Sequence, residues 1–160
     1  MVSVVARRRT VEERLKILED IEAIKRLKHE YCFALDRRDW SSVTELFARD
    51  GVVDYGPIGN AKGRKAIRKL FVERISRSFT FFAHMAHNPV IDVKGDRATG
   101  KWYFDIPSTV APRRARWIAG WYEDEYIRED GDWRFAHVKS SYFYISSYEK
   151  GWGKERFIEG

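Results

Sequence analysis

Hydrophobic residues in the first third of the chain recur at the three- and four-residue steps that are typical of an α-helix. The apolar positions of this stripe are Ile17, Ile21, Ile24, Leu27, Tyr31 and Leu35. The charged residues between them are expected to face water, namely Lys25, Arg26, Lys28 and Glu30. Thr10 and Glu13 have the spacing of a capping box, which begins a helix. The pattern therefore predicts a helix that closes at Asp36, either continuous or divided by a second cap at Asp20.

The next segment predicts shorter elements. Ser41 or Ser42 is expected to cap a short helix that runs to Phe47. Residues 52–55 predict a short strand between two turn sequences that contain glycine. Helical spacing of apolar residues returns over residues 65–75.

From residue 79 the hydrophobic pattern changes to the period of two that indicates strands. Strands are expected at about 79–93, 97–106, 115–128 and 132–147, with residues 107–114 as a longer loop. Helices grouped before a long run of strands predict an α+β fold. In this arrangement the N-terminal helices pack in a strongly curved antiparallel sheet, which forms a cone with an internal pocket. We expect a single domain over residues 1–160, with an extra helical segment at about 1–19 and a C-terminal tail at about 149–160.

Composition agrees with a single globular domain, since 160 residues are enough for one sizeable core. Aromatic residues make up 15% of the chain, which suits an aromatic-lined cavity. The single cysteine, Cys32, cannot form an internal disulfide, so a reducing cytoplasm is the expected location. No apolar run is long enough to cross a membrane, and the first residues lack the apolar segment of a signal peptide.

The formal net charge of +6 is read mainly as a solvated basic surface. Nucleic acid is not an expected partner, because the chain has neither a recognition motif nor basic residues interleaved with aromatic ones. The arginines at 113, 114 and 116 could instead contact an anionic part of a ligand.

Two segments carry candidate chemistry, because a carboxylate beside an imidazole can move protons at neutral pH. Tyr31 lies in the buried stripe, so its hydroxyl must find a partner or line a pocket. Asp36 lies in the last turn of the same helix and off the centre of the stripe, where both a surface role and a functional role are open. His84 shares its strand face with Asn88, whereas His87 takes the other face. The two rings therefore diverge, and no metal site is expected.

The chain resembles the SnoaL-like proteins of the nuclear-transport-factor-2-like superfamily, which have a cystatin-like fold. The resemblance rests on residues 20–28, Tyr31, Leu35-Asp36, Trp40 and Tyr55, and on the segments 84–89, 98–103 and 126–133. The bile-acid 7α-dehydratase type is the nearest within the family. Scytalone dehydratase and hexachlorocyclohexane dehydrochlorinase are more distant relatives.

This resemblance implies that Asp36 and His84 form a catalytic dyad inside the cone. In such relatives the aspartate orients the histidine, which removes a proton from a carbon beside or conjugated to a carbonyl. Tyr31 is then a third catalytic residue, and Tyr55 falls where a family tyrosine contacts the substrate oxygen. Asn88 and Trp102, which lie in two of the matching segments, are further expected substrate-binding residues.

The resemblance also raises a question about a third acid in the pocket. The bile-acid enzymes carry this acid on the strand after Trp-Tyr, and ungapped matching puts Ile106 at that position. Asp105 is one residue earlier, and one step along a strand turns a side chain to the opposite face. Either a bulge brings Asp105 into the pocket as a substrate-binding residue, or the pocket lacks this acid.

The sequence and the resemblance together predict a cofactor-independent lyase. The expected reaction is loss of water from a hydrophobic, ring-containing hydroxy-ketone or enone of steroid or polyketide type. The alternatives are a double-bond isomerase that uses the same dyad and a non-catalytic member of the fold that binds small molecules. The expected partners are a small hydrophobic substrate, which could be a CoA thioester, and further copies of the chain in a dimer or trimer.

Overall fold

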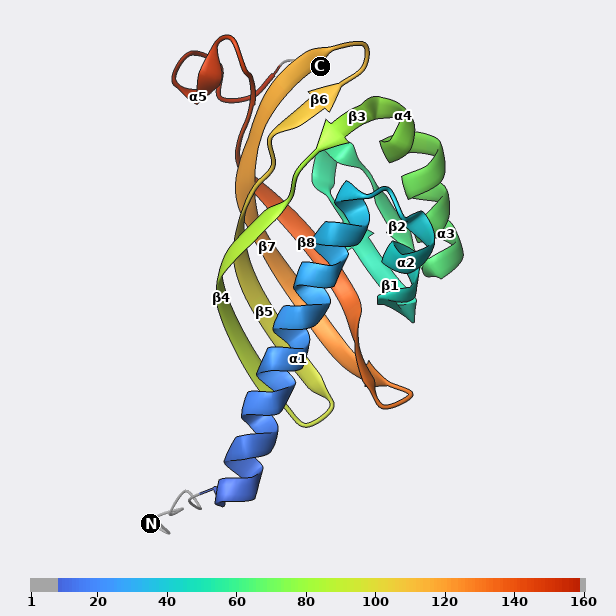
Figure 1. Cartoon of the computed structure of the whole chain (residues 1–160), viewed down its shortest axis with the longest axis vertical. Helices are drawn as coiled ribbons and strands as arrows, with labels where there is room; N and C mark the ends of the chain where they lie inside the picture. The colour runs from blue at the N-terminus through green and yellow to red at the C-terminus, as the bar shows by residue number, and fades with distance from the viewer. Residues whose placement is uncertain (1–8, 159–160) are drawn as a thin grey trace, which may run out of the picture.

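The computed structural model describes residues 9–158 as one long helix, a large curved sheet and a group of short helices. Helix α1 (Val11–Asp36) runs across the inner face of the sheet, and α2, α3 and α4 gather beside its C-terminal end (Figure 1). The side chains between helix and sheet form a mostly aromatic and aliphatic core. The predicted α+β class is confirmed, and this arrangement leaves a pocket near the end of α1.

Helix α1 is continuous, and its capping box is confirmed by both reciprocal hydrogen bonds. The Glu13 amide donates to Thr10 Oγ1 at 3.1 Å, and the Thr10 amide donates to Glu13 Oε2 at 2.8 Å. Asp20 does not cap a second helix, because its carboxylate accepts from Trp133 Nε1 at 3.1 Å and from Arg128. Asp20 thus ties the middle of α1 to the sheet, and residues 11–19 are the first turns of the same helix.

The prediction that Lys28 faces water is wrong, because its side chain is 0% exposed. Its ammonium lies 2.9 Å from Asp124 Oδ2, and the Asp124 side chain is also fully buried. Helical periodicity assigns a lysine to the polar face, whereas a carboxylate on the facing strand can compensate its charge in the core.

The short helices differ from their predicted bounds. Helix α2 (Trp40–Glu45) is capped by Asp39, whose Oδ1 accepts from the Ser42 amide at 3.1 Å, so neither serine is the cap. Helix α3 (Arg64–Lys69), the π-helical turn η2 (Leu70–Ile75) and α4 (Ser76–Ser78) follow one another without a break. A 3-10 turn η1 (Gly56–Ile58) and helix α5 (Gly151–Lys154) complete the set. Within residues 9–158, no helix has the length and apolar character needed to cross a membrane.

The sheet is mixed rather than purely antiparallel. Its strands are β1 (Phe47–Asp54), β2 (Asn60–Lys62), β3 (Phe79–Phe82), β4 (Met85–Lys94), β5 (Arg97–Asp105), β6 (Ser108–Val110), β7 (Arg114–Glu129) and β8 (Asp132–Ser147). The main order is β2-β1-β8-β7-β5-β4, and β6 pairs with both β7 and β3. Strand β1 pairs with β8 in parallel, because the helical segment after β1 carries the chain away before the meander begins.

Two predicted strand boundaries are also wrong. The strand expected over residues 79–93 is broken into β3 and β4 at Ala83 and His84, because the Asp36 carboxylate accepts the His84 amide. The expected loop at 107–114 contains strand β6, which pairs with β3 and β7. The first of these differences forms part of the candidate site.

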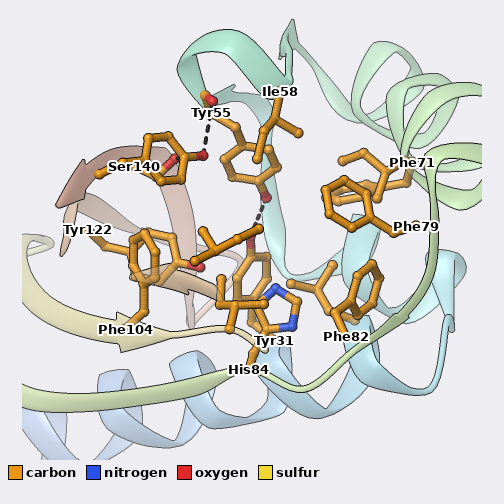
Figure 2. Close-up of a pocket in the computed structure, with 15 residues that line it drawn as sticks. Tyr31, Tyr55, Ile58, Phe71, Phe79, Phe82, His84, Phe104, Tyr122 and Ser140 are labelled. Atoms are coloured by element: carbon orange, nitrogen blue, oxygen red, sulfur yellow. Dashed lines mark hydrogen bonds between the residues drawn. The ribbon is translucent and has the colours of Figure 1, made fainter. Parts of the chain in front are cut away.

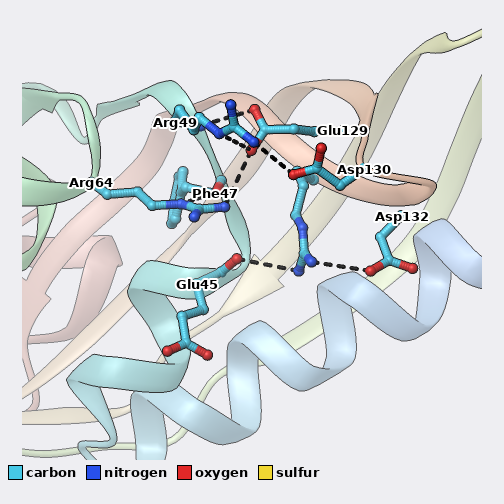
Figure 3. Close-up of polar contacts among 8 residues, drawn as sticks. Glu45, Phe47, Arg49, Arg64, Glu129, Asp130 and Asp132 are labelled. Atoms are coloured by element: carbon cyan, nitrogen blue, oxygen red, sulfur yellow. Dashed lines mark hydrogen bonds and ion pairs between the residues drawn. The ribbon is translucent and has the colours of Figure 1, made fainter.

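Polar contacts join the β7–β8 hairpin to β1, α2 and α3 (Figure 3). Asp130 and Gly131 both have positive φ, as a two-residue type I′ turn requires. The Arg49 amide and the Arg64 guanidinium both donate to the Glu129 carboxylate, at 3.1 and 3.4 Å. These bonds fix the parallel edge of the sheet at the end opposite the pocket.

The C-terminal tail folds back on β8. The Ile145 amide donates to the Arg156 carbonyl at 2.9 Å, and the Trp152 ring stacks on Tyr144 with 5.0 Å between centroids. No tail residue up to 158 lines the pocket.

Candidate functional site

The candidate site is an apolar pocket between the C-terminal half of α1, the η2 turn and the inner face of the sheet (Figure 2). Its free volume is about 60 Å³, and its walls are mostly aromatic and aliphatic. The lining residues are Tyr31, Leu35, Tyr55, Ile58, Phe71, Ile75, Phe79, Phe82, His84, Phe104, Ile106, Ile118, Tyr122, Ser140 and Tyr142. No lysine, arginine, aspartate or glutamate is among them, so the part of a ligand that enters is expected to be uncharged.

Asp36 and His84 are in direct contact at the wall of this pocket. Nδ1 of His84 lies 2.7 Å from Asp36 Oδ1, and the His84 amide donates to both carboxylate oxygens at 3.0 Å. The pair is half-buried, with His84 lining the pocket and Asp36 behind it. Because Asp36 occupies Nδ1, the Nε2 atom is the ring nitrogen left for a ligand, and it has no hydrogen-bond partner within residues 9–158.

Local structure explains why these two residues meet. Asp36 is the last residue of α1, and the chain then turns through Arg38, which has a φ of 59°. The Arg38 guanidinium donates to the Phe79 carbonyl at 3.0 Å, which holds the segment before His84 against the end of α1. The His84 ring packs edge-on against Phe82, with 5.0 Å between centroids. These contacts fix both the carboxylate and the imidazole.

Tyr31 and Tyr55 meet inside the pocket through a hydrogen bond between their hydroxyls (Figure 2). Burial is the main cause that raises the pKa of each hydroxyl well above its usual value, so both are protonated at neutral pH. Tyr142 donates to the Tyr55 carbonyl at 3.1 Å, and Ser140 Oγ lies 2.9 Å from the Tyr142 hydroxyl. Burial likewise raises the pKa of Tyr142 to about 12.

Three other predicted substrate-binding residues lie outside the pocket lining. Trp102 is buried in the core, where its indole donates to the Tyr126 hydroxyl at 3.0 Å. Asn88 is exposed, with a φ of 55°, and the pairing of β4 with β5 shifts between His87 and Val90. This irregularity breaks the simple alternation that put Asn88 on the face of His84.

The question about Asp105 is answered by the strand register. Ile106 lines the pocket, while Asp105 is partly exposed and lies 2.9 Å from Nε2 of His87 through Oδ2. No bulge lies between the paired residues 97–105 of β5 and their partners on β7. Asp105 therefore forms a second carboxylate–histidine pair outside the pocket.

The sequence patterns did not single out three polar residues of the pocket, Tyr122, Ser140 and Tyr142. They alternate with outward-facing residues on β7 and β8, as many core positions do, so periodicity gives no signal that separates them. Within residues 9–158, no group of three or more histidine, cysteine, aspartate or glutamate side chains is placed to hold a metal ion.

Comparison with solved structures shows the same fold. A protein of Novosphingobium aromaticivorans, provisionally described as a scytalone dehydratase, is 27% identical with a TM-score of 0.75, over 82% of this chain and 89% of its own. The hexachlorocyclohexane dehydrochlorinase LinA-type3 of Novosphingobium barchaimii is 21% identical with a TM-score of 0.78, over 92% of this chain and 99% of its own.

Sequence comparison identifies the family. The uncharacterized protein Rv2910c of Mycobacterium tuberculosis is 28% identical over 119 residues, which are 73% of this chain and 81% of that protein. The sequence profile of the SnoaL-like domain matches residues 16–139, which include α1, the short helices and most of the sheet. The chain therefore belongs to the SnoaL-like family.

Proposed function

We propose that this protein is a lyase that uses its own side chains to remove water from a small, ring-containing hydroxy-ketone or enone. The observation that carries the proposal is the 2.7 Å contact between Asp36 and His84 at the wall of an apolar pocket. The described likeness to a provisionally assigned scytalone dehydratase agrees with this class of reaction.

In this reaction His84 acts first as a base and then as an acid. Because Asp36 contacts Nδ1, that nitrogen carries its hydrogen toward the carboxylate and Nε2 presents a lone pair to the pocket. Nε2 takes a proton from the carbon beside the carbonyl, and the Asp36 carboxylate stabilises the imidazolium that forms. The imidazolium then returns the proton to the departing hydroxyl, so that one water leaves and a carbon–carbon double bond remains.

The Tyr31–Tyr55 pair is suited to bind the carbonyl oxygen. Two hydroxyls carry two hydrogens, and their mutual bond uses one of them, so one hydrogen remains for a ligand. A donor aimed at the carbonyl oxygen stabilises the negative charge that develops there when the neighbouring carbon loses its proton.

The size of the pocket limits how a substrate enters. A free volume of about 60 Å³ holds only a few water molecules, whereas pockets for drug-sized ligands are several times larger. A ring compound therefore has to displace side chains of the wall, where Phe71, Ile75 and Phe79 come from the η2–β3 segment. This favours substrates of one or two rings over a full steroid.

The test is loss of water from a panel of one- and two-ring hydroxy-ketones, followed by mass spectrometry and by absorbance of the enone product. Wild type is expected to convert at least one compound, and His84→Ala is expected to lose this activity. His87→Ala is the matched control, because His87 also contacts a carboxylate but lies outside the pocket. Equal turnover by wild type and His84→Ala would contradict the proposal, and a product of unchanged mass would indicate an isomerase.

A CoA thioester is a further proposal for the form of the substrate. Its phosphates could not enter the apolar pocket and would lie outside it, where Arg113 and Arg114 are exposed at the turn before β7. The double substitution Arg113→Ala/Arg114→Ala is expected to raise KM for such a thioester and to leave kcat unchanged. An unchanged KM would exclude this role of the two arginines.

A further inference from the structure

Tyr122 presents a hydroxyl to the pocket that the dyad chemistry does not use. Its side chain comes from the inner face of β7, and the residue is only 3% exposed. The hydroxyl points toward the interior of the pocket, near Tyr31 (Figure 2). It has no hydrogen-bond partner among the residues that the structure describes, whereas the hydroxyls of Tyr31, Tyr55 and Tyr142 all have one.

A buried hydroxyl without a partner is costly unless a ligand or water meets it. Burial raises the pKa of Tyr122 well above its usual value, so the group is a hydrogen-bond donor across the physiological range. The unpartnered donor is therefore directed at whatever occupies the pocket.

The ring of Tyr122 is held from behind. The Lys28 ammonium lies 3.3 Å from the ring centroid, and the same ammonium is paired with Asp124 at 2.9 Å. Phe104 packs against the ring with 4.5 Å between centroids. Because a desolvated cation over an aromatic face contributes about 2 kcal/mol, these contacts restrict the ring and aim its hydroxyl.

The number of available hydrogens gives the hydroxyl a role. A carbonyl oxygen has two lone pairs, and an oxyanion site typically supplies two donors. The Tyr31–Tyr55 pair leaves one hydrogen for a ligand, and Tyr122 supplies a second. We propose that Tyr122 is a substrate-contacting residue whose hydroxyl, with the Tyr31–Tyr55 pair, completes a two-donor site for the substrate oxygen. This rests on the proposed function for the identity of the oxygen, but not for the existence of the site.

Binding of para-nitrophenol tests the proposal without turnover. Its phenolate oxygen resembles the oxyanion of the reaction, and its absorbance changes when the oxygen accepts hydrogen bonds. Wild type is expected to bind it saturably, and Tyr122→Phe is expected to bind about tenfold more weakly, since the hydroxyl is lost while the ring stays on Lys28. Tyr103→Phe is the matched control, because Tyr103 is 48% exposed and lies outside the pocket.

The outcomes separate this inference from the proposed reaction. Equal affinity of wild type and Tyr122→Phe, or no saturable binding by wild type, would overturn the two-donor site. If no hydroxy-ketone loses water but Tyr122→Phe still weakens binding, the reaction is wrong and the site stands. If water is lost and Tyr122→Phe binds like wild type, the site is wrong and the reaction stands. The urea midpoint of Tyr122→Phe verifies that the variant is folded.

Discussion

Asp36 contacts His84 through both its backbone and its ring, with two bonds of 3.0 Å to the amide and one of 2.7 Å to Nδ1. The carboxylate therefore has two separate effects. Its bonds to the amide position the chain between β3 and β4, and its bond to the ring selects the nitrogen that faces the pocket. A neutral amide could retain the first effect and lose the second.

Asp36→Asn is accordingly expected to fold and to lose activity. The side-chain carbonyl can still accept the His84 amide, but no negative charge remains to stabilise the imidazolium. Turnover of a hydroxy-ketone is expected to fall by about 10²-fold or more, measured as kcat. Asp105→Asn removes the carboxylate from the other pair, which lies outside the pocket, and is expected to keep wild-type kcat. Equal losses in the two variants would argue against the dyad.

The Tyr31–Tyr55 pair predicts a non-additive effect on catalysis. Tyr31→Phe and Tyr55→Phe each remove one hydroxyl, but the remaining hydroxyl no longer donates to a partner and keeps a hydrogen for the substrate. Each single variant is expected to lose less than about tenfold in kcat, and the double variant is expected to lose more than the product of the two. Additive losses would indicate that the tyrosines act independently.

The buried pair of Lys28 and Asp124 predicts a large effect on stability. Lys28→Met leaves the fully buried Asp124 carboxylate without its cation, so the free energy of unfolding is expected to fall by about 3–5 kcal/mol. Arg26→Met removes an ion pair on the same helix, but the Arg26 side chain is 81% exposed, so a loss below about 1 kcal/mol is expected. Urea unfolding measures both variants.

A double variant distinguishes charge from packing at this site. Lys28→Met/Asp124→Leu removes both buried charges and is expected to recover most of the stability lost in Lys28→Met. A double variant as unstable as the single one would show that the contacts of Lys28 with the ring of Tyr122, rather than its charge, hold α1 to the sheet.

His87 predicts a pH dependence of stability. Hydrogen bonds from Asp105 and Asn88 raise the pKa of His87 above 6.5. The folded state then binds the proton more tightly than the unfolded state, so this contribution to stability is fully present below pH 6.5 and is lost as pH rises through the folded pKa. NMR titration of the ring measures the pKa, and urea midpoints on both sides of that pH measure the stability.

Asp105→Asn is the control for this titration. The variant is expected to move the pKa of His87 back toward 6.5 and to flatten the change of urea midpoint with pH. If the wild type and the variant lose stability equally over the same pH range, another group is responsible for the dependence.

The sequence by itself determined those features that depend on neighbouring residues. The capping box of Thr10 and Glu13 and the turn at Asp130 and Gly131 follow from short-range backbone chemistry, and both are confirmed. The buried stripe around Ile24 and the alternation of the late strands follow from a fixed helical or strand period. These patterns were sufficient for the α+β class.

The tertiary structure alone decided what depends on partners distant in sequence. Lys28 is buried because Asp124 lies across from it, 96 residues further along the chain. Asn88 and Asp105 lie outside the pocket because an irregular step in β4 and an unbroken register in β5 set their faces. Asp36 and His84 are 48 residues apart, and no local pattern fixes their contact. Helix period and strand alternation describe one element at a time, whereas the site forms only when the end of α1 packs against the break between β3 and β4.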